Sequence, residues 1–393
     1  MNNKEAAIIS TTSEKDHHAK RPIKLLVTVN GELLEEWGGD THPTHARIYH
    51  IINELKKFDN IEILYIRFNQ KPRINLINKI YNNIVKTSVA MRYLSKIIKY
   101  NPVVYFEYPY YMTVLQNQIV FKICVLLGIK TILDVHDTVE QSEAISNGVS
   151  ALNRETERYC FRNATIISFS LNPAMWAKLT EMYQVPEEKK VVFVPNAFEK
   201  SFMGEHQEAY KSVEGRFNIC YIGGLSKNRG VDILISASSN LHSKYPYLKL
   251  YLFGEYSEGF SEETKKIIES SNFITRNLFK RKDLPRMLKD IDLFVMPYNP
   301  EIDYTNLCSP TKFFEYMATG RPVLSTKCKS VLDLAAGGVI YADYNAIDFE
   351  EKIEELITNQ ELREKLSAEQ ASQRYHHTWE ERAKRIHDAL MEI

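Results

Sequence analysis

The chain has 393 residues, of which 44% are hydrophobic and 25% are charged, an ordinary balance for a soluble globular protein. Its 50 Lys and Arg residues equal its 50 Asp and Glu residues, so the basic excess of a dedicated nucleic-acid binder is missing and no nucleic-acid partner is expected. The 5 cysteines show no CxxC spacing, which argues against a disulfide framework and predicts reduced, cytoplasmic thiols.

Apolar strands alternate with amphipathic helices along the sequence, after a polar segment that lacks the apolar region of a signal peptide. No run of 18 apolar residues predicts a membrane-spanning helix. In the first half, strands are expected at residues 23–29, 61–66, 103–106, 131–135, 164–169 and 191–194. In the second half, strands are expected at residues 217–222, 248–253, 273–275, 293–297, 323–325 and 339–341. Two helical stretches, residues 349–358 and 361–392, follow the last strand.

This alternation predicts an α/β fold of two Rossmann-like, doubly wound domains that face each other across a cleft. The expected organisation is a disordered tail (1–22), an N-terminal domain (23–200), a polar linker (201–215), a C-terminal domain (216–375) and a final helix (376–393). Parallel sheets of this kind bind ligands at the carboxyl ends of their strands. We therefore expect the functional residues to follow strands and to face the cleft.

The segment SPTKFFEYMATGRPV, which begins at Ser309, carries the strongest chemical signal. A Ser-Pro turn opens a helix there, and Lys312 and Glu315 are three residues apart, so they share one face. A helix N-terminus with a nearby Lys suits a diphosphate, and a Glu can accept hydrogen bonds from two vicinal ribose hydroxyls. The alternative is a structural helix with a solvated Lys–Glu pair.

This segment resembles the donor-site helix of GT-B glycosyltransferases, in particular the retaining family 4 group. The family pattern P-x-K-x-x-E-Y-M-A-x-G-x-P-V matches at Pro310, Lys312, Glu315, Tyr316, Met317, Ala318, Gly320, Pro322 and Val323. The resemblance implies that Glu315 binds the donor ribose and that backbone amides near Ser309, Pro310 and Thr311 hold the diphosphate. One departure is Leu307, which stands where the family usually has a second Glu beside the transferred sugar.

A second match is the segment YIGGLSKNRGVDILISA after the first strand of the C-terminal domain. Gly223 fits the family's glycine-rich loop, and Arg229 stands where a Lys usually contacts the diphosphate. Gly224 replaces a family Arg, and Lys227 is expected to compensate for that lost cation. The alternative is a glycine-rich strand-to-helix turn with exposed cations. The resemblance also places Gly254 beneath the nucleotide base and Arg276 beside it.

In the N-terminal domain, a loop with paired glycines precedes a predicted helix. The resemblance places Gly38, Gly39 and Asp40 over the donor phosphates and the acceptor, although an Asp there is also a good helix N-cap. His136 follows the strand at 131–135, and the resemblance implies that it reaches the transferred sugar; a structural histidine is the alternative. Glu107 follows the strand at 103–106 and is a further cleft candidate. No Cys or Asp companion supports a metal site, so none is expected.

The stretch between Phe68 and Phe106 contains no Asp or Glu. Seven cations from Lys71 to Lys99 alternate there with apolar residues at partly helical spacing, which predicts peripheral contact with an anionic membrane surface. A core-facing helix with a solvated cationic face is the alternative.

The expected function is transfer of a hexose-type sugar from a UDP- or GDP-sugar to a glycan or a lipid-linked acceptor in surface polysaccharide or glycoconjugate synthesis. His136 and Glu315 are the expected catalytic residues, and no cofactor beyond the nucleotide sugar is expected. Two alternatives remain open. One is a nucleotide-sugar epimerase of the same fold, and the other is a degenerate binding or assembly subunit.

Overall fold

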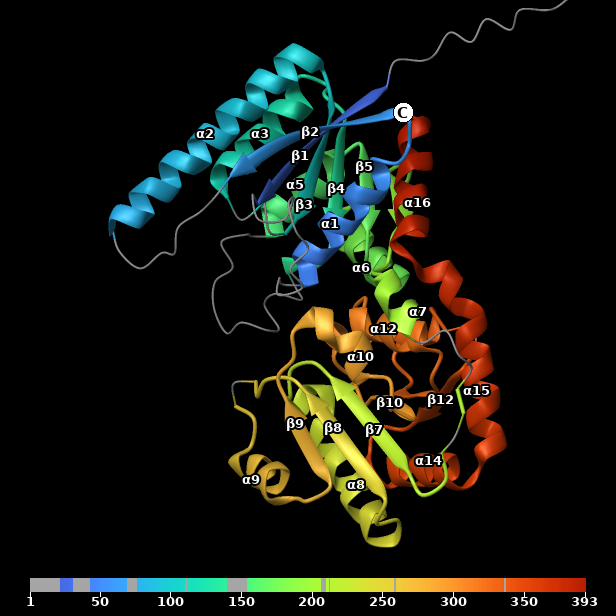
Figure 1. The fold of residues 1–393 in the computed structure, drawn as a ribbon. Coiled ribbons are helices and arrows are strands. Elements are labelled where there is room, and N and C mark those ends of the chain that lie inside the picture. The colour runs from blue at the N-terminus through green and yellow to red at the C-terminus, as the bar shows by residue number, and fades with distance from the viewer. Residues whose placement is uncertain are drawn as a thin grey trace, which may run out of the picture.

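Two parallel six-stranded sheets form the centres of two domains in the computed structural model (Figure 1). The structure describes residues 22–30, 43–68, 76–109, 112, 114–139, 154–205, 210–211, 213–257, 259–335 and 337–393. Every strand pair in both sheets is parallel. The fold expected from the sequence, two Rossmann-like α/β domains, is therefore confirmed. In the described part of the chain, no helix has both the length and the apolar character needed to cross a bilayer.

The first sheet has the strand order β2-β1-β3-β4-β5-β6. Its strands are β1 (Ile23–Asn30), β2 (Ile61–Phe68), β3 (Val103–Tyr108), β4 (Thr131–Val135), β5 (Ile166–Phe169) and β6 (Lys190–Phe193). The helices of this domain are α1 (Pro43–Leu55), α2 (Leu76–Tyr100), α3 (Leu115–Leu126), α5 (Arg154–Asn163) and α6 (Pro173–Tyr183).

The second sheet has the strand order β12-β11-β10-β7-β8-β9. Its strands are β7 (Phe217–Ile222), β8 (Leu248–Phe253), β9 (Ile274–Asn277), β10 (Leu293–Met296), β11 (Val323–Thr326) and β12 (Val339–Ala342). The longer helices around it are α8 (Val231–Lys244), α9 (Glu262–Ser270), α12 (Thr311–Thr319), α14 (Ala346–Thr358) and α15 (Gln360–Gln373). The shorter ones are α7 (Lys200–Glu205), α10 (Leu284–Met287), α11 (Asp303–Asn306) and α13 (Lys329–Leu332), with 3-10 turns η3 (Lys227–Arg229) and η4 (Arg281–Asp283).

Apolar side chains cover both faces of the first sheet, as a parallel sheet with crossover helices requires. Along β1, Leu25 and Val27 point into the core beneath α1, whereas Leu26 points into the core beneath α2, α3 and α6. Strands β3 and β4 are buried over their full length. Near-continuous apolar strands were therefore a reliable sign of central position in the sheet.

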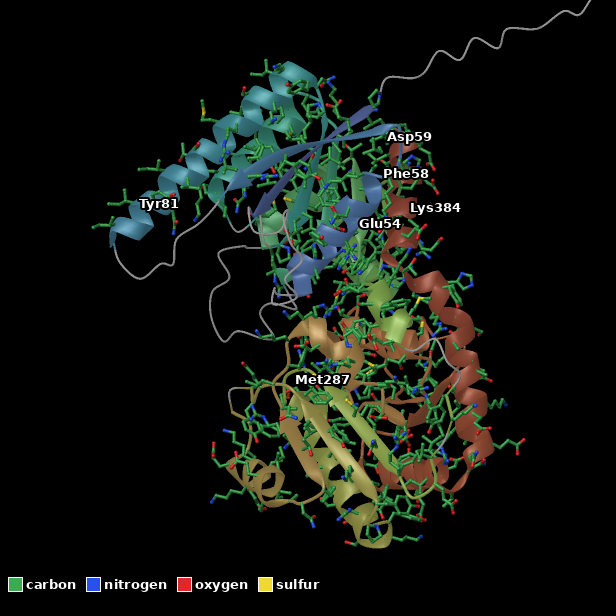
Figure 2. The ribbon with its side chains drawn as sticks, viewed as in Figure 1. Glu54, Phe58, Asp59, Tyr81, Met287 and Lys384 are labelled. Carbon is green, nitrogen blue, oxygen red and sulfur yellow. The ribbon has the colours of Figure 1, made fainter. Side chains whose placement is uncertain are left out.

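The last part of the chain crosses from the second domain back to the first (Figure 1). The sequence suggested one helical stretch from 361 to 392, but the structure divides it into α15, the 3-10 turn η5 (Arg374–His377) and α16 (Trp379–Met391). The break allows α15 to cover the second domain while α16 packs against α1 of the first. Phe58, after α1, stacks on His387 of α16 with ring centroids 4.0 Å apart, close to the position of Lys384 in Figure 2.

The polar segment expected to be a linker begins with helix α7. Phe202 on this helix is fully buried in the apolar core shared with α10 and α12. This apolar contact gives the segment a helical start, which its polar composition did not indicate.

Arg382 of α16 binds the chain where the two domains meet. Its guanidinium is fully buried and donates hydrogen bonds to the carbonyl oxygens of Pro195, Asn196 and His376 at 3.0, 3.3 and 3.1 Å. It also lies 2.9 Å from Nδ1 of His377. One side chain thus joins the crossover turn to the segment that leaves the first domain.

Replacing Arg382 with Met should lower the free energy of unfolding by about 2–4 kcal/mol, because several buried acceptors lose their donor together. Urea denaturation followed by circular dichroism measures this change. Lys384→Met changes an exposed cation on the same helix and should cost less than about 0.5 kcal/mol. Equal losses of unfolding free energy in the two variants would contradict a stabilising role of the Arg382 hydrogen bonds.

Candidate active site

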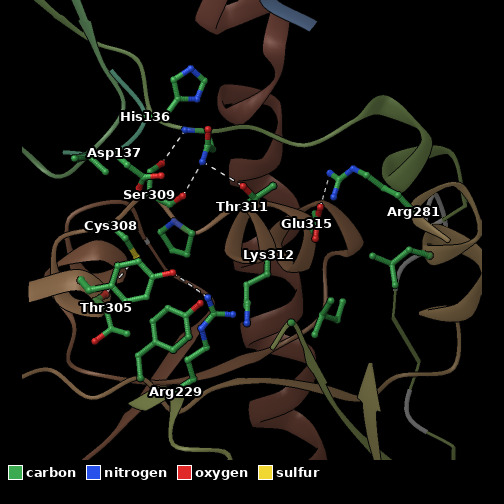
Figure 3. A pocket seen from close by; sticks show the side chains of 18 of the residues that line it. His136, Asp137, Arg229, Arg281, Thr305, Cys308, Ser309, Thr311, Lys312 and Glu315 are labelled. Atoms are coloured by element: carbon green, nitrogen blue, oxygen red, sulfur yellow. Dashed lines mark hydrogen bonds and ion pairs between the residues drawn. The ribbon is translucent and has the colours of Figure 1, made fainter. Parts of the chain in front are cut away.

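A cavity of about 490 Å³ opens between the two domains, and Figure 3 shows the side chains that line it. His136, Asp137, Leu171 and Asn196 of the first domain contribute to its wall, and the second domain supplies the rest. The cavity lies at the carboxyl ends of the strands, where doubly wound domains bind ligands. Among the residues singled out from the sequence, the lining includes His136, Gly223, Arg229, Ser309, Pro310, Thr311, Lys312 and Glu315.

Helix α12 begins at the cavity without a side-chain cap. Asn196 holds the preceding turn in place: its backbone N–H donates to Oγ of Ser309 at 2.8 Å, and its side-chain amide donates to the Ser309 carbonyl at 2.7 Å. The same amide donates to Oγ1 of Thr311 at 3.2 Å. The partial positive charge of the helix N-terminus is therefore available to an anion in the cavity.

Lys312 places a buried ammonium group at the centre of the cavity (Figure 3). The residue is only 8% exposed, and its Nζ has no hydrogen-bond partner among the described residues. Nζ lies 4.0 Å from the ring centroid of Tyr221 and 5.2 Å from that of Tyr298. Burial lowers the pKa of Lys312 well below its usual value, and the positive charge of Arg229 lowers it further. An anionic ligand in the cavity would offset the cost of burying a cation at this position.

Because Gly223 has no side chain, it leaves room for the end of the Lys312 side chain. A Cβ atom at this position would lie 2.6 Å from Nζ of Lys312 and 3.3 Å from Nη1 of Arg229. The φ angle of +122° also favours glycine. Arg229 itself lines the cavity and donates a hydrogen bond from Nη2 to the Tyr304 hydroxyl at 3.0 Å. The glycine thus allows two cations to reach the same part of the cavity.

Glu315 lies one helical turn beyond Lys312 and is 2% exposed. Its Oε1 lies 2.5 Å from Nη2 of Arg281, which in turn donates from Nε to Oε1 of Glu199 at 2.7 Å. Glu199 belongs to the segment that connects the domains. An ion-pair chain therefore joins the carboxylate of Glu315 to the interdomain connection.

His136 follows β4 and sits above buried charged groups of the first sheet. Its Nε2 lies 3.3 Å from Oδ2 of Asp134 and 3.7 Å from Oε1 of Glu107. Asp134 and Glu107 are direct partners across β3 and β4, and Arg47 of α1 binds Asp134 through two nitrogens at 2.8 and 3.0 Å. Burial alone would raise the pKa of Asp134, but Arg47 and His136 lower it well below its usual range. Glu107 thus lies behind His136 and outside the cavity lining.

Leu307, at the position of the family's second Glu, takes part in the contact between the domains. It is 6% exposed and packs in the apolar core of the first domain. Its carbonyl accepts a hydrogen bond from the backbone N–H of Asn172 at 3.1 Å. The Asn172 side chain donates to Oδ2 of Asp333 at 2.8 Å. The departure from the family pattern therefore coincides with an apolar domain contact.

Four residues predicted to bind the donor lie outside the cavity lining: Gly224, Lys227, Gly254 and Arg276. Lys227 is exposed on η3. Gly254 lies against Gly223, since a Cβ on it would be 2.0 Å from the Gly223 carbonyl oxygen. Arg276 donates to the Gly254 carbonyl at 3.2 Å and covers the ring of Tyr256 at 4.1 Å. Three further predicted residues, Gly38, Gly39 and Asp40, fall outside the described residues.

The structure adds cavity residues that the sequence reasoning missed. Phe279, Arg281 and Leu284 also line the cavity, and Arg281 lies beside Glu315. Arg281 lies in the charged run KRKD, which resembles an ordinary solvated turn. The only signal in the sequence was the position of Phe279, an aromatic residue two places after a strand end. Within the described ranges, no three His, Cys, Asp or Glu side chains gather as a metal site.

Comparison with known protein families gives a match for the second domain. Residues 216–359 match the family described as "Glycosyl transferases group 1". The second domain is therefore similar to a group 1 glycosyltransferase domain. Among curated relatives, the capsular polysaccharide biosynthesis glycosyltransferase CapM of Staphylococcus aureus is 29% identical over 170 residues, which is 40% of this chain and 41% of CapM. Spore coat protein SA of Bacillus subtilis (strain 168) is 23% identical over 174 residues, or 41% of this chain and 45% of that protein. Each match thus spans less than half of the relative.

Solved structures extend the likeness to both domains. A sucrose-phosphate synthase from Thermosynechococcus elongatus aligns with a TM-score of 0.67 and 12% identity, covering 95% of this chain and 99% of that chain. Anabaena Alr3699/HepE in complex with UDP-glucose aligns with a TM-score of 0.64 and 15% identity, covering 94% and 100%. At sequence identities this low, the structural similarity establishes the fold alone. The group 1 domain therefore forms the second half of a GT-B fold.

Replacing Lys312 with Met should stabilise the ligand-free protein by about 1–3 kcal/mol at neutral pH, because a buried group without a partner is removed. Since the folded pKa of Lys312 lies below its unfolded value, the native lysine is most costly at low pH, and this cost fades as pH rises toward the unfolded pKa. Thermal denaturation across pH measures the gain. Lys227→Met, a substitution at an exposed position nearby, should give no gain in stability. A destabilised Lys312→Met variant would contradict the view that Lys312 is a buried group without a partner.

A second prediction concerns Glu107, whose pKa is raised by burial to about 7, against the lowering effect of His136. The folded state therefore retains a proton that the unfolded state loses, and stability falls as pH rises from about 4.5 to 7. Glu107→Gln should flatten this decline and raise stability above pH 7 by an amount on the order of 1–3 kcal/mol. Glu62→Gln, at an exposed position on the edge strand β2, should leave the pH profile unchanged; an unchanged profile in Glu107→Gln would refute the prediction.

Proposed function

We propose that the chain is a glycosyltransferase that moves a hexose-type sugar from a nucleotide diphosphate sugar to a glycan or lipid-linked acceptor. The observation that carries this proposal is the buried ammonium of Lys312, which has no hydrogen-bond partner among the described residues and faces the cavity beside Arg229. Two cations and a helix N-terminus at one point match the charge of a diphosphate. The group 1 family assignment of residues 216–359 supports the same conclusion.

The donor is proposed to lie along the second domain. Its diphosphate contacts Lys312, Arg229 and the first backbone amides of α12, and its ribose hydroxyls contact Glu315. We propose that the base lies toward Phe279 and Leu284, which also line the cavity. Aromatic rings are suited to stack on nucleobases. A uridine base is the choice that the structural neighbours favour, because Alr3699/HepE is described in complex with UDP-glucose and MnaA of S. aureus in complex with UDP.

Charge explains how the site accelerates the reaction. Transfer breaks the bond between the sugar C1 and a diphosphate oxygen, forms a bond from C1 to the acceptor oxygen and releases the proton of the acceptor hydroxyl, so negative charge grows on the diphosphate. Lys312 and Arg229 are already in place to stabilise this charge, and the low polarity around them strengthens the effect. We propose that these cations make a bound metal unnecessary.

His136 is proposed to contact the transferred sugar, because it enters the cavity from the first domain opposite α12. Asp134 and Glu107 behind it hold the ring in place. We propose that the acceptor approaches from the first-domain side and that the anomeric configuration is retained. The similarity to CapM, a capsular polysaccharide biosynthesis glycosyltransferase, supports a role in surface polysaccharide synthesis.

A screen of UDP-, GDP-, ADP- and CMP-sugars tests this function through thermal shift and release of free nucleotide. One donor should stabilise the protein selectively and be turned over, with proton NMR of the product reporting the anomeric configuration. Glu315→Gln and Lys312→Met should each weaken binding of that donor by about tenfold or more, since each removes a hydrogen bond or ion pair to a charged partner.

Glu301→Gln, an exposed carboxylate near the cavity, serves as the matched control and should bind the donor like the native chain. Selective binding without turnover, even with added acceptors, would favour a binding or assembly subunit. Conversion of the bound nucleotide sugar without an acceptor would favour an epimerase. Unaltered donor affinity in both Glu315→Gln and Lys312→Met would remove this cavity from the donor site.

A further inference from the structure

Helix α2 carries apolar residues on two different faces. Val89, Tyr93 and Ile97 are buried against the first sheet. A second row recurs every seven residues on the outer face, at Ile77, Ile84, Met91 and Ile98, with exposed fractions of 75%, 64%, 63% and 82%. A surface helix needs only one apolar face to pack on its own domain. The outer row therefore has no function in the core.

The neighbouring helix α3 enlarges this apolar surface. It packs beside α2 and belongs to the same core on the same face of the sheet, so both helices present their outer sides away from the sheet. Leu115, Ile119 and Leu126 on α3 are exposed. Of the 19 large hydrophobic side chains that are exposed among the described residues, 10 lie between Ile77 and Leu127. This concentration marks an interaction surface.

Positive charge surrounds the outer face. Arg92 and Lys99 are exposed on α2, Lys96 is half-buried there, and Lys122 is exposed on α3 between Ile119 and Leu126. No Asp or Glu occurs anywhere from Phe68 to Phe106. Helices α2 and α3 thus combine apolar side chains with cations and contain no Asp or Glu.

This combination distinguishes between two possible binding partners of an apolar helix face, a second copy of the helix and a lipid surface. A second copy of α2 would place cations beside cations, which is unfavourable at a helix–helix seam. An anionic lipid surface satisfies both features, since apolar side chains enter the boundary of headgroups and acyl chains while cations meet the lipid phosphates. We propose that the outer face of α2, together with α3, docks the protein on an anionic lipid bilayer.

The direction of α2 relates this surface to the cavity. Strand β2 ends at Phe68 on the carboxyl edge of the sheet, and α2 begins shortly afterwards at Leu76. The first turns of α2, with Ile77, Ile80 and Ile84, therefore follow the carboxyl edge of the sheet, and His136 follows β4 at that same edge. Figure 2 shows Tyr81 near the free end of this helix. If the proposed transfer is correct, docking through α2 brings the cleft to the plane where a lipid-linked acceptor is held.

Sedimentation of the full chain with sucrose-loaded vesicles tests the docking. The native chain should bind vesicles that contain phosphatidylglycerol, bind pure phosphatidylcholine much less, and be released by salt. The triple variant Ile77→Gln, Ile84→Gln, Met91→Gln should lose about tenfold or more in vesicle affinity, because it removes apolar side chains that enter the bilayer. The triple variant Arg92→Gln, Lys96→Gln, Lys99→Gln should lose at least as much on anionic vesicles and little on neutral ones.

Ile267→Gln together with Ile347→Gln replaces exposed apolar residues on α9 and α14 and should leave vesicle binding unchanged. Donor binding in solution should be the same in all these variants, so failure of the docking is distinguishable from failure of the proposed transfer. Absence of binding to anionic vesicles would overturn the proposal. A native dimer in light scattering that becomes a monomer in the apolar triple variant would assign the outer face to a second copy instead.

Discussion

The ammonium group of Lys312 is the constraint on which the cleft depends. It is buried between two tyrosine rings and beside another cation, in a position that costs stability unless an anion enters. Gly223 must lack a side chain to leave room for it, and Asn196 fixes the turn from which its helix begins. The energetic cost of placing these two cations together is therefore incurred during folding, before any ligand binds.

The two domains are joined by contacts that differ in chemical character. Leu307 inserts an apolar side chain into the first domain, Arg382 binds the carbonyl oxygens of the connecting segment, and Arg281 joins Glu199 to Glu315. The last of these contacts ends inside the cavity. A ligand that competes for the Glu315 carboxylate therefore acts on a group that is also bound, through Arg281, to the connection between the domains.

Local signals in the sequence were sufficient for the strands and for the helix from Thr311 to Thr319. The position of Lys312 at the cavity followed from the resemblance of that helix to a donor-site helix, because its spacing alone also fits a solvated Lys–Glu pair. Apolar runs identify buried parallel strands, and a Ser-Pro turn before an amphipathic pattern identifies a helix start. Contacts between distant segments were not predictable in this way. Arg281 occurs in a run of charges typical of a solvated turn, and Arg276, which looked equally suitable, instead covers Tyr256. The direction of a long cationic side chain depends on tertiary neighbours that no local pattern contains.

The return of α16 to the first domain has a consequence for biosynthesis. During vectorial translation the first six strands leave the ribosome long before residues 379–391, yet Trp379, Ala383 and Ile386 complete one face of that domain's core. Part of this apolar face, beside α1, therefore stays uncovered in the nascent first domain while the whole second domain is made and folds. A chaperone that shields exposed apolar surface would find its binding site there, and it would be displaced by the protein's own last helix.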